Sequence, residues 1–222
     1  SAFWRAQRLE DTTLGWRFVN PALRAEYGVD SMPVTGDNVA HAYAISRADQ
    51  DAFALRSQQR AAQASAAGYF AEEIVPVVIP GKHGETVIEA DEHPRAASTL
   101  AALETLKPVN GPGQTVTAGN ASGLNDGACA MVLASADAVA KYGLTPRAKV
   151  LGMASGGVAP RIMGVGPLPA VRTLLTRLGL GIHDFDVIEL NEAFAAQSLA
   201  VTRAWGLADD DARVNPNGGA IA

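Results

Sequence analysis

The run Glu189-Leu190-Asn191-Glu192-Ala193-Phe194, together with the later run Asn215-Pro216-Asn217-Gly218-Gly219-Ala220-Ile221-Ala222, decides how the fold is interpreted. Residues 185–190 are mostly apolar and predict a buried strand, and residues 193–205 predict a helix. Asn191 therefore falls at the carboxyl end of a strand and near the start of a helix, where ligands of α/β proteins gather. Its amide can donate to a developing oxyanion, directly or through water. The alternative is a helix N-cap, which spacing alone favours.

From residue 125 onward, predicted strands alternate with predicted helices. The strands are expected at 128–135, 148–155 and 185–190, and the helices at 136–142, 167–178 and 193–205. This alternation indicates an α/β layered fold.

The first 124 residues do not alternate in this way and predict a separate, mostly helical lobe with a small sheet element. The expected elements are an irregular segment at 1–32, helices at 34–45, 46–67 and 98–106, a hairpin of 73–79 with 85–90, and a strand at 115–117. We therefore divide the chain into residues 1–124, 125–145 and 146–222.

Two Gly-rich stretches are further candidates for ligand contacts. In the string 117–127, small side chains allow a ligand to approach the backbone, and Ser122 offers a hydroxyl group. In the string 163–170, glycines precede a helix, a pattern that can hold a phosphate but is not a Walker loop. On composition alone, both stretches are better explained as tight connections or structural turns.

The composition excludes several classes of function. The net charge of −5 gives no reason to expect a nucleic acid or an anionic membrane as partner, and no apolar run is long enough to span a bilayer. The single cysteine, Cys129, leaves no internal disulfide, which fits a cytoplasmic protein. The chain starts without Met and stops inside a Gly-rich run, so we expect a piece of a longer protein.

No residue pattern indicates a metal site, so we expect none. The four histidines, His41, His83, His93 and His183, lack the spacing of metal ligands and are expected to be structural or exposed. Cys129 lies inside an apolar, strand-like run and is expected to be buried rather than a nucleophile.

Four segments, in order, resemble the thiolases: 36–40, 117–127, 163–170 and 191–222. The resemblance covers essentially the whole chain. It implies a partial thiolase-like layered αβαβα fold with an inserted, mostly helical loop domain at 1–124. It also implies an acyltransferase that uses coenzyme A as a substrate, without a further cofactor, and that forms homodimers or homotetramers.

The resemblance also assigns roles to single residues. Asn191 would orient a water molecule in the oxyanion hole. Arg95 would meet the nucleotide end of CoA, where a guanidinium can face phosphate or stack on adenine. The residues expected along the pantetheine path are Met32, Ser122, Phe194, Leu23 and Ala118. Position 31 is Ser, where thiolases often carry His.

The catalytic groups of the thiolases match no residue of this chain. Their nucleophilic cysteine belongs to a segment that would precede Ser1, and their histidine and second cysteine to segments that would follow Ala222. Cys129 matches neither cysteine. These 222 residues alone are therefore expected to be inactive, and to be unstable or to aggregate.

A narrower likeness concerns the substrate. Residues 11–21 and 28–33 resemble the thiolases that act on 3-oxoadipyl-CoA, for which Arg17 would face the distal carboxylate; an exposed surface arginine is the alternative role. Two other interpretations stay open. One is a thiolase for acetoacetyl-CoA or a fatty 3-oxoacyl-CoA, and the other is a non-catalytic module that binds CoA esters or a protein.

Overall fold

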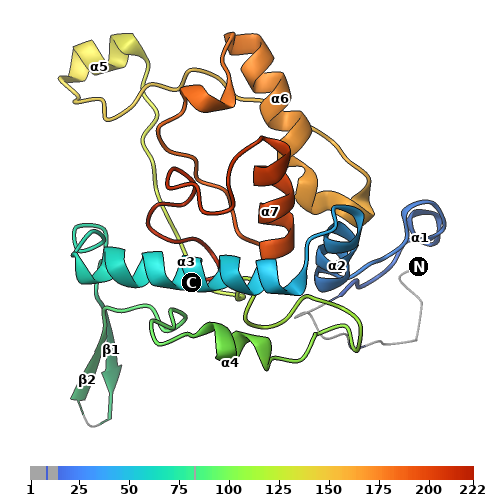
Figure 1. The fold of residues 1–222 in the computed structure, drawn as a ribbon. Coiled ribbons are helices and arrows are strands. Elements are labelled where there is room, and N and C mark those ends of the chain that lie inside the picture. The colour runs from blue at the N-terminus through green and yellow to red at the C-terminus, as the bar shows by residue number, and fades with distance from the viewer. Residues whose placement is uncertain (1–8, 10–14, 83) are drawn as a thin grey trace, which may run out of the picture.

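A computed structural model describes residues 9, 15–82 and 84–222 (Figure 1). The α-helices are α1 (Pro21–Tyr27), α2 (Met32–Ala42), α3 (Arg47–Ala66), α4 (Leu100–Glu104), α5 (Ala136–Tyr142), α6 (Pro167–Leu178) and α7 (Ala195–Ala204). The 3-10 helices are η1 (Pro160–Val165) and η2 (Ile182–Asp184). Strands β1 (Val77–Gly81) and β2 (Gly84–Ile88) form an antiparallel hairpin. No helix among the described residues has the length and apolar character that crossing a membrane requires.

Helix α3 is the longest element and runs through the middle of the molecule, with α4 on one side and α7 on the other (Figure 1). Its start is fixed by Ser46, whose Oγ accepts a hydrogen bond from the backbone N–H of Asp49 at 3.1 Å. This confirms the helix predicted after Ser46.

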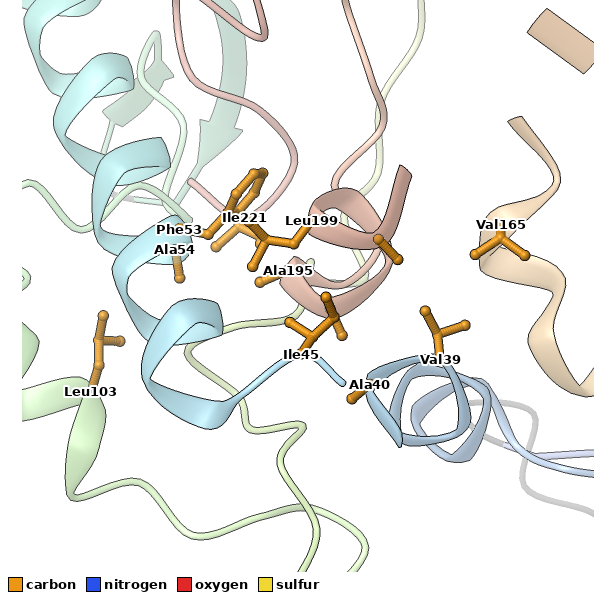
Figure 2. Packing of buried hydrophobic residues seen from close by; sticks show 12 residues of the cluster. Val39, Ala40, Ile45, Phe53, Ala54, Leu103, Val165, Ala195, Leu199 and Ile221 are labelled. Carbon is orange, nitrogen blue, oxygen red and sulfur yellow. The ribbon is translucent and has the colours of Figure 1, made fainter. Parts of the chain in front are cut away.

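The hydrophobic core lies where α2, α3 and α7 meet (Figure 2). Phe53 of α3, Leu199 of α7 and Ile221 near the end of the chain are each almost fully buried. Truncation of one such side chain costs about 2–5 kcal/mol. The core therefore joins residues before position 55 with residues after position 190.

Arginines of α3 hold loops of the chain through their backbone carbonyls. Arg47 donates to the carbonyl oxygens of Leu103 (2.7 Å) and Leu106 (3.1 Å) at the end of α4. Arg60 donates to four carbonyls in the loop after α7, those of Asp210, Asp211, Val214 and Asn215. Loop carbonyls removed from water need donors, and a guanidinium carries five N–H groups in a fixed arrangement.

Several predicted helix bounds are wrong in detail. Helix α1 lies in the segment 1–32 that we predicted to be irregular, although Asn20 caps it through bonds from Ala22 and Leu23, and Gly28 ends it at φ +75°. Helix α2 spans 32–42 instead of 34–45, and Thr99 rather than Ser98 caps α4. The helices at 136–142 and 167–178 are confirmed.

The predicted strands outside the hairpin do not form ladders. Beyond β1–β2, the described residues contain only two isolated bridges, Ala121 with Phe194 and Ile188 with Val214. A strand needs a neighbour for its N–H and C=O groups. The predicted strands 128–135 and 148–155 have none among the described residues, and nearly all of their side chains are exposed. Cys129 is consequently exposed, and our expectation that it is buried was wrong.

The hairpin prediction is confirmed with shifted bounds, although His83 in its turn lies outside the described residues. Pro76 directly precedes β1, which keeps it out of the ladder. The described part of the 11–21 segment starts at Gly15.

Replacement of Arg60 by Met should lower the free energy of unfolding by about 1.5–3 kcal/mol, because it removes a charged donor from several loop carbonyls. Urea denaturation measures this change. Arg172→Met on the exposed face of α6 is the matched control, for which we expect a change within about 0.5 kcal/mol. Equal effects of the two variants would contradict the role given to Arg60.

Candidate functional site

Two motifs that lie far apart in the sequence meet in the structure. Ser122 N–H donates to the carbonyl of Ala193 (3.0 Å), and Ala195 N–H donates to the carbonyl of Asn120 (2.9 Å). These bonds flank the antiparallel bridge between Ala121 and Phe194. The Gly-rich string 117–127 and the run 189–194 are therefore joined through their main chains.

Asn120 fixes the Gly-rich string to α3. It is fully buried, its Oδ1 accepts from Thr117 N–H (2.8 Å), and its Nδ2 donates to Asp51 Oδ1 (3.0 Å). Asp51 in turn pairs with Arg47 at 2.7 Å. Gly119 packs closely on the terminal methyl groups of Leu106 and Leu103, which would have to shift to admit a Cβ at this position.

Asn191 is exposed, whereas the residues on either side of it, Leu190 and Glu192, are buried. Its own carbonyl accepts a bond from Gln197 Nε2 at 3.2 Å. The N-cap of α7 is Phe194, whose N–H donates to Gln197 Oε1 (3.1 Å). The capping role for Asn191 was therefore wrong, and within the described part of the chain its side-chain amide makes no hydrogen bond.

Glu192 is a buried carboxylate that sequence reasoning missed. It accepts bonds from Ser57 Oγ (2.6 Å), Asn215 Nδ2 (2.8 Å) and Ile221 N–H (3.3 Å), with 2% of its surface exposed. A Cβ at Gly219 would overlap its carboxyl group. The signal in the sequence was the Gly-Gly pair of the final run, since glycines there leave room for a neighbouring side chain.

A cavity of about 380 Å³ lies beside α3 and α4 and is lined by Arg95, Ala118, Gly119, His93, Leu103 and Leu106, among others. The backbone N–H of Arg95 donates to Gln58 Oε1 at 2.7 Å. His93 Nδ1 lies 2.8 Å from the carbonyl oxygen of Ala222. The apolar wall and the guanidinium suit a ligand with a hydrocarbon part and an anionic part. Sequence reasoning named Arg95 and Ala118 but missed His93.

The remaining predicted site residues are Met32, Leu23 and Arg17, which lie in or before helices α1 and α2. Met32 begins α2 and is 47% exposed. One turn later, a Cβ at Gly36 would come within 3.0 Å of Phe194 Cγ, so α2 packs closely on the Phe194 ring. Leu23 belongs to α1, which lies beyond α2 at the opposite end of the molecule from the hairpin (Figure 1). Arg17 precedes α1 and donates to the carbonyl of Gly15 at 3.3 Å.

The structure thus pairs the segment of Ser122 with the segment of Phe194, three residues after Asn191, and it places Arg95 with Ala118 in one cavity. Ala118 and Ser122 belong to the same Gly-rich string. This string therefore connects the cavity with the paired segments 120–122 and 193–195. Leu23 lies on α1, and Arg17 precedes that helix. Across residues 9, 15–82 and 84–222, no three His, Cys, Asp or Glu side chains are grouped as a metal ion would require.

Glu189, two residues before Asn191, has a shifted pKa. Burial, and after it the negative charge of Glu192, raises the pKa of Glu189 above its usual value. A carboxyl group with a raised pKa contributes stability while it is protonated, and that contribution is lost as the pH rises through the raised pKa.

Glu189→Gln should therefore raise the midpoint of urea unfolding slightly at pH 7, because it removes a charge that the folded state disfavours. The difference in unfolding midpoint between the variant and the unmodified chain should shrink as the pH falls below about 4. There the carboxyl group of Glu189 is protonated in both the folded and the unfolded state. A variant that is less stable at pH 7 would contradict this expectation.

Comparison with known proteins agrees with this geometry. The thiolase N-terminal domain matches residues 5–137, and the thiolase C-terminal domain matches residues 144–222. The chain is 74% identical over 222 residues to a beta-ketoadipyl-CoA thiolase of Pseudomonas knackmussii, covering all of this chain and 55% of that protein. It is 58% identical over 223 residues to a 3-oxoadipyl-CoA/3-oxo-5,6-dehydrosuberyl-CoA thiolase of Escherichia coli, covering 100% of this chain and 56% of that protein. The chain therefore spans little more than half the length of these relatives.

A solved structure shows the same fold. Human mitochondrial 3-ketoacyl-CoA thiolase in complex with CoA matches with a TM-score of 0.79 and 46% identity, over 86% of this chain and 47% of that one. This confirms the predicted partial thiolase-like α/β fold. Since the two thiolase domains together match most of the sequence, the chain belongs to the thiolase family.

Proposed function

We propose that the protein carrying this chain is an acetyl-CoA C-acyltransferase that cleaves 3-oxoadipyl-CoA with free CoA, giving succinyl-CoA and acetyl-CoA, or runs the reverse condensation. The observation that supports the proposal is the antiparallel contact between residues 120–122 and 193–195, which pairs the Gly-rich string with the segment that follows the exposed Asn191. The printed names of the Pseudomonas and Escherichia relatives support this substrate.

The chemistry explains why such a surface is needed. Attack of a cysteine thiolate on the C3 carbonyl and cleavage of the C2–C3 bond leave the succinyl group on the cysteine and release acetyl-CoA as an enolate, which then takes up a proton. The thiol of free CoA then takes the succinyl group from the cysteine and gives succinyl-CoA. The negative charge on the thioester oxygen must be stabilised, and an amide donor such as Asn191 does this directly or through water. The cysteine that would hold the succinyl group is proposed to lie outside residues 1–222, because Cys129 matches neither cysteine of the thiolases and does not line the cavity.

The CoA molecule is proposed to lie along the Gly-rich string. Arg95 would bind its phosphates or stack on its adenine, with Ala118 beside it in the cavity. Ser122, Met32 and Phe194 would line the pantetheine arm, with Leu23 at the far end. Arg17 would face the distal carboxylate of the oxoadipyl group.

The arrangement of the whole protein is also a proposal. Residues 1–124 would form the loop domain, 125–145 the end of the first thiolase half and 146–222 part of the second. A homodimer or homotetramer in the cytoplasm, with CoA thioester and free CoA as its small-molecule partners, fits the family and the single cysteine.

The proposed reaction is tested by thiolysis with the natural protein that carries this sequence. Loss of absorbance of the 3-oxoacyl thioester is followed with 3-oxoadipyl-CoA and with acetoacetyl-CoA. We expect a higher kcat/KM on 3-oxoadipyl-CoA, and a preference reduced about tenfold by Arg17→Gln. Faster turnover of acetoacetyl-CoA would contradict the substrate, and CoA binding without any turnover would favour a non-catalytic module.

Arg95→Met should raise the KM for free CoA about tenfold with little change in kcat, because the cavity contacts CoA at a distance from the reacting carbonyl. Steady-state kinetics with varied CoA measure this separation. Arg177→Met, on the exposed face of α6, is the control and should leave both constants unchanged. A fall in kcat at unchanged KM for Arg95→Met would contradict the placement of CoA.

A further inference from the structure

We propose that Glu192 and Asn215 are positioning residues that hold Asn191 in its reactive orientation, with Ser57 of α3 as their anchor. This proposal rests on the proposed function, in which Asn191 stabilises the enolate. Neither Glu192, Asn215 nor Ser57 was among the site residues predicted from the sequence.

The surroundings of Glu192 consist of donors. Asn215 Nδ2 and the Ile221 N–H donate to it, and Ser57 Oγ donates to it while accepting a bond from the Gly219 N–H at 3.0 Å. A serine hydroxyl has one proton, so the bond from Gly219 leaves that proton for Glu192. The site therefore matches a carboxylate, which accepts from all sides, and it does not match a side-chain amide.

Asn215 holds the residue on the other side of Asn191. Its Oδ1 accepts from the Leu190 N–H (2.7 Å), and its Nδ2 donates to the Leu190 carbonyl (2.8 Å) as well as to Glu192. Its backbone is left-handed at φ +47°, a conformation that asparagine tolerates better than most residues. One side-chain amide therefore takes the place of a neighbouring strand for Leu190.

The result is a fixed main chain around an exposed side chain. Leu190 is held by Asn215, Glu192 is held by its three donors, and the carbonyl of Asn191 is held by Gln197. Leu190 and Glu192 point inward, so Asn191 points outward between them. A donor that is fixed before the reaction needs no reorganisation when charge develops, which is where such groups gain their catalytic effect.

The anchor connects this arrangement to α3 and to the Gly218–Gly219 turn. Ser57 is buried on α3 and contacts both Glu192 and Gly219. Gly218 has φ +83° and packs on Ala61, so this turn also has no space for a side chain. Loss of the Glu192 carboxylate would free the backbone on both sides of Asn191 without changing Asn191 itself.

The test is a double-mutant cycle of Glu192→Gln and Asn191→Ala in the natural protein that carries this sequence. Glu192→Gln keeps the shape but presents an N–H to a site made of donors. We expect kcat for 3-oxoadipyl-CoA thiolysis to fall about 100-fold, while the KM for CoA changes less than about threefold. In the Asn191→Ala background, the same substitution should lower kcat less than about threefold.

Each outcome decides between the alternatives. If Glu192→Gln lowers kcat by the same factor in both backgrounds, Glu192 acts on the fold in general and the positioning role is overturned. If the unsubstituted protein has no thiolysis activity, the proposed function fails, and the positioning role fails with it. The two failures are distinguishable because only the second appears without any substitution. Glu189→Gln, an exposed glutamate of the same segment, is the matched control with unchanged kcat.

A milder variant covers the case in which Glu192→Gln does not fold. Ser57→Ala removes one donor to Glu192 and the acceptor for Gly219, and should lower kcat about fivefold to tenfold, again only when Asn191 is present. Ser198→Ala is its control, a buried serine of α7 whose hydroxyl has no hydrogen-bond partner among the described residues. Equal loss of kcat in the Ser57 and Ser198 variants would overturn the proposal.

Discussion

The structure depends on polar groups of α3 that satisfy buried partners in distant segments. Asp51 accepts from Asn120, Ser57 donates to Glu192, and Arg60 donates to the carbonyls of the loop after α7. A buried carboxylate or carbonyl without a partner costs far more than one ordinary hydrogen bond gains. The loops of the site are therefore ordered because α3 supplies their partners, while the apolar core between α2, α3 and α7 supplies most of the burial.

Local signals in the sequence were sufficient for much of the fold. The helices predicted at 46–67, 136–142 and 167–178 are confirmed as α3, α5 and α6, and their ends carry local signals: serine N-caps at Ser46 and Ser135, and glycine C-caps after α5 and α6. Asn20, Pro21 and Gly28 carried the same kind of signal for α1, and we overlooked it. The predicted strands 128–135 and 148–155 were wrong because a strand also requires a partner, and pairing is not a local property.

The candidate site was predicted in part, through the family resemblance more than through chemistry. The motifs identified Asn191, Ser122, Phe194 and Arg95, and the structure pairs the two segments that carry the first three. The motifs did not identify Glu192, Asn215 and His93 as site residues. The local sequence around a glutamate, an asparagine or a histidine in a loop does not show whether its side chain is buried or solvated. The importance of these three residues depends on contacts between residues that are 23 to 135 positions apart.

The attachment of both motifs to α3 has a consequence for how the sequence can change. Asp51 and Ser57 are six residues apart on one helix, which corresponds to roughly 9 Å along its axis. The length of helix between these two residues thus sets the separation of two loops from different parts of the chain. A residue inserted or deleted between positions 51 and 57 would turn one attachment point by about 100° relative to the other, so this stretch should tolerate substitutions on its exposed side but no change in length.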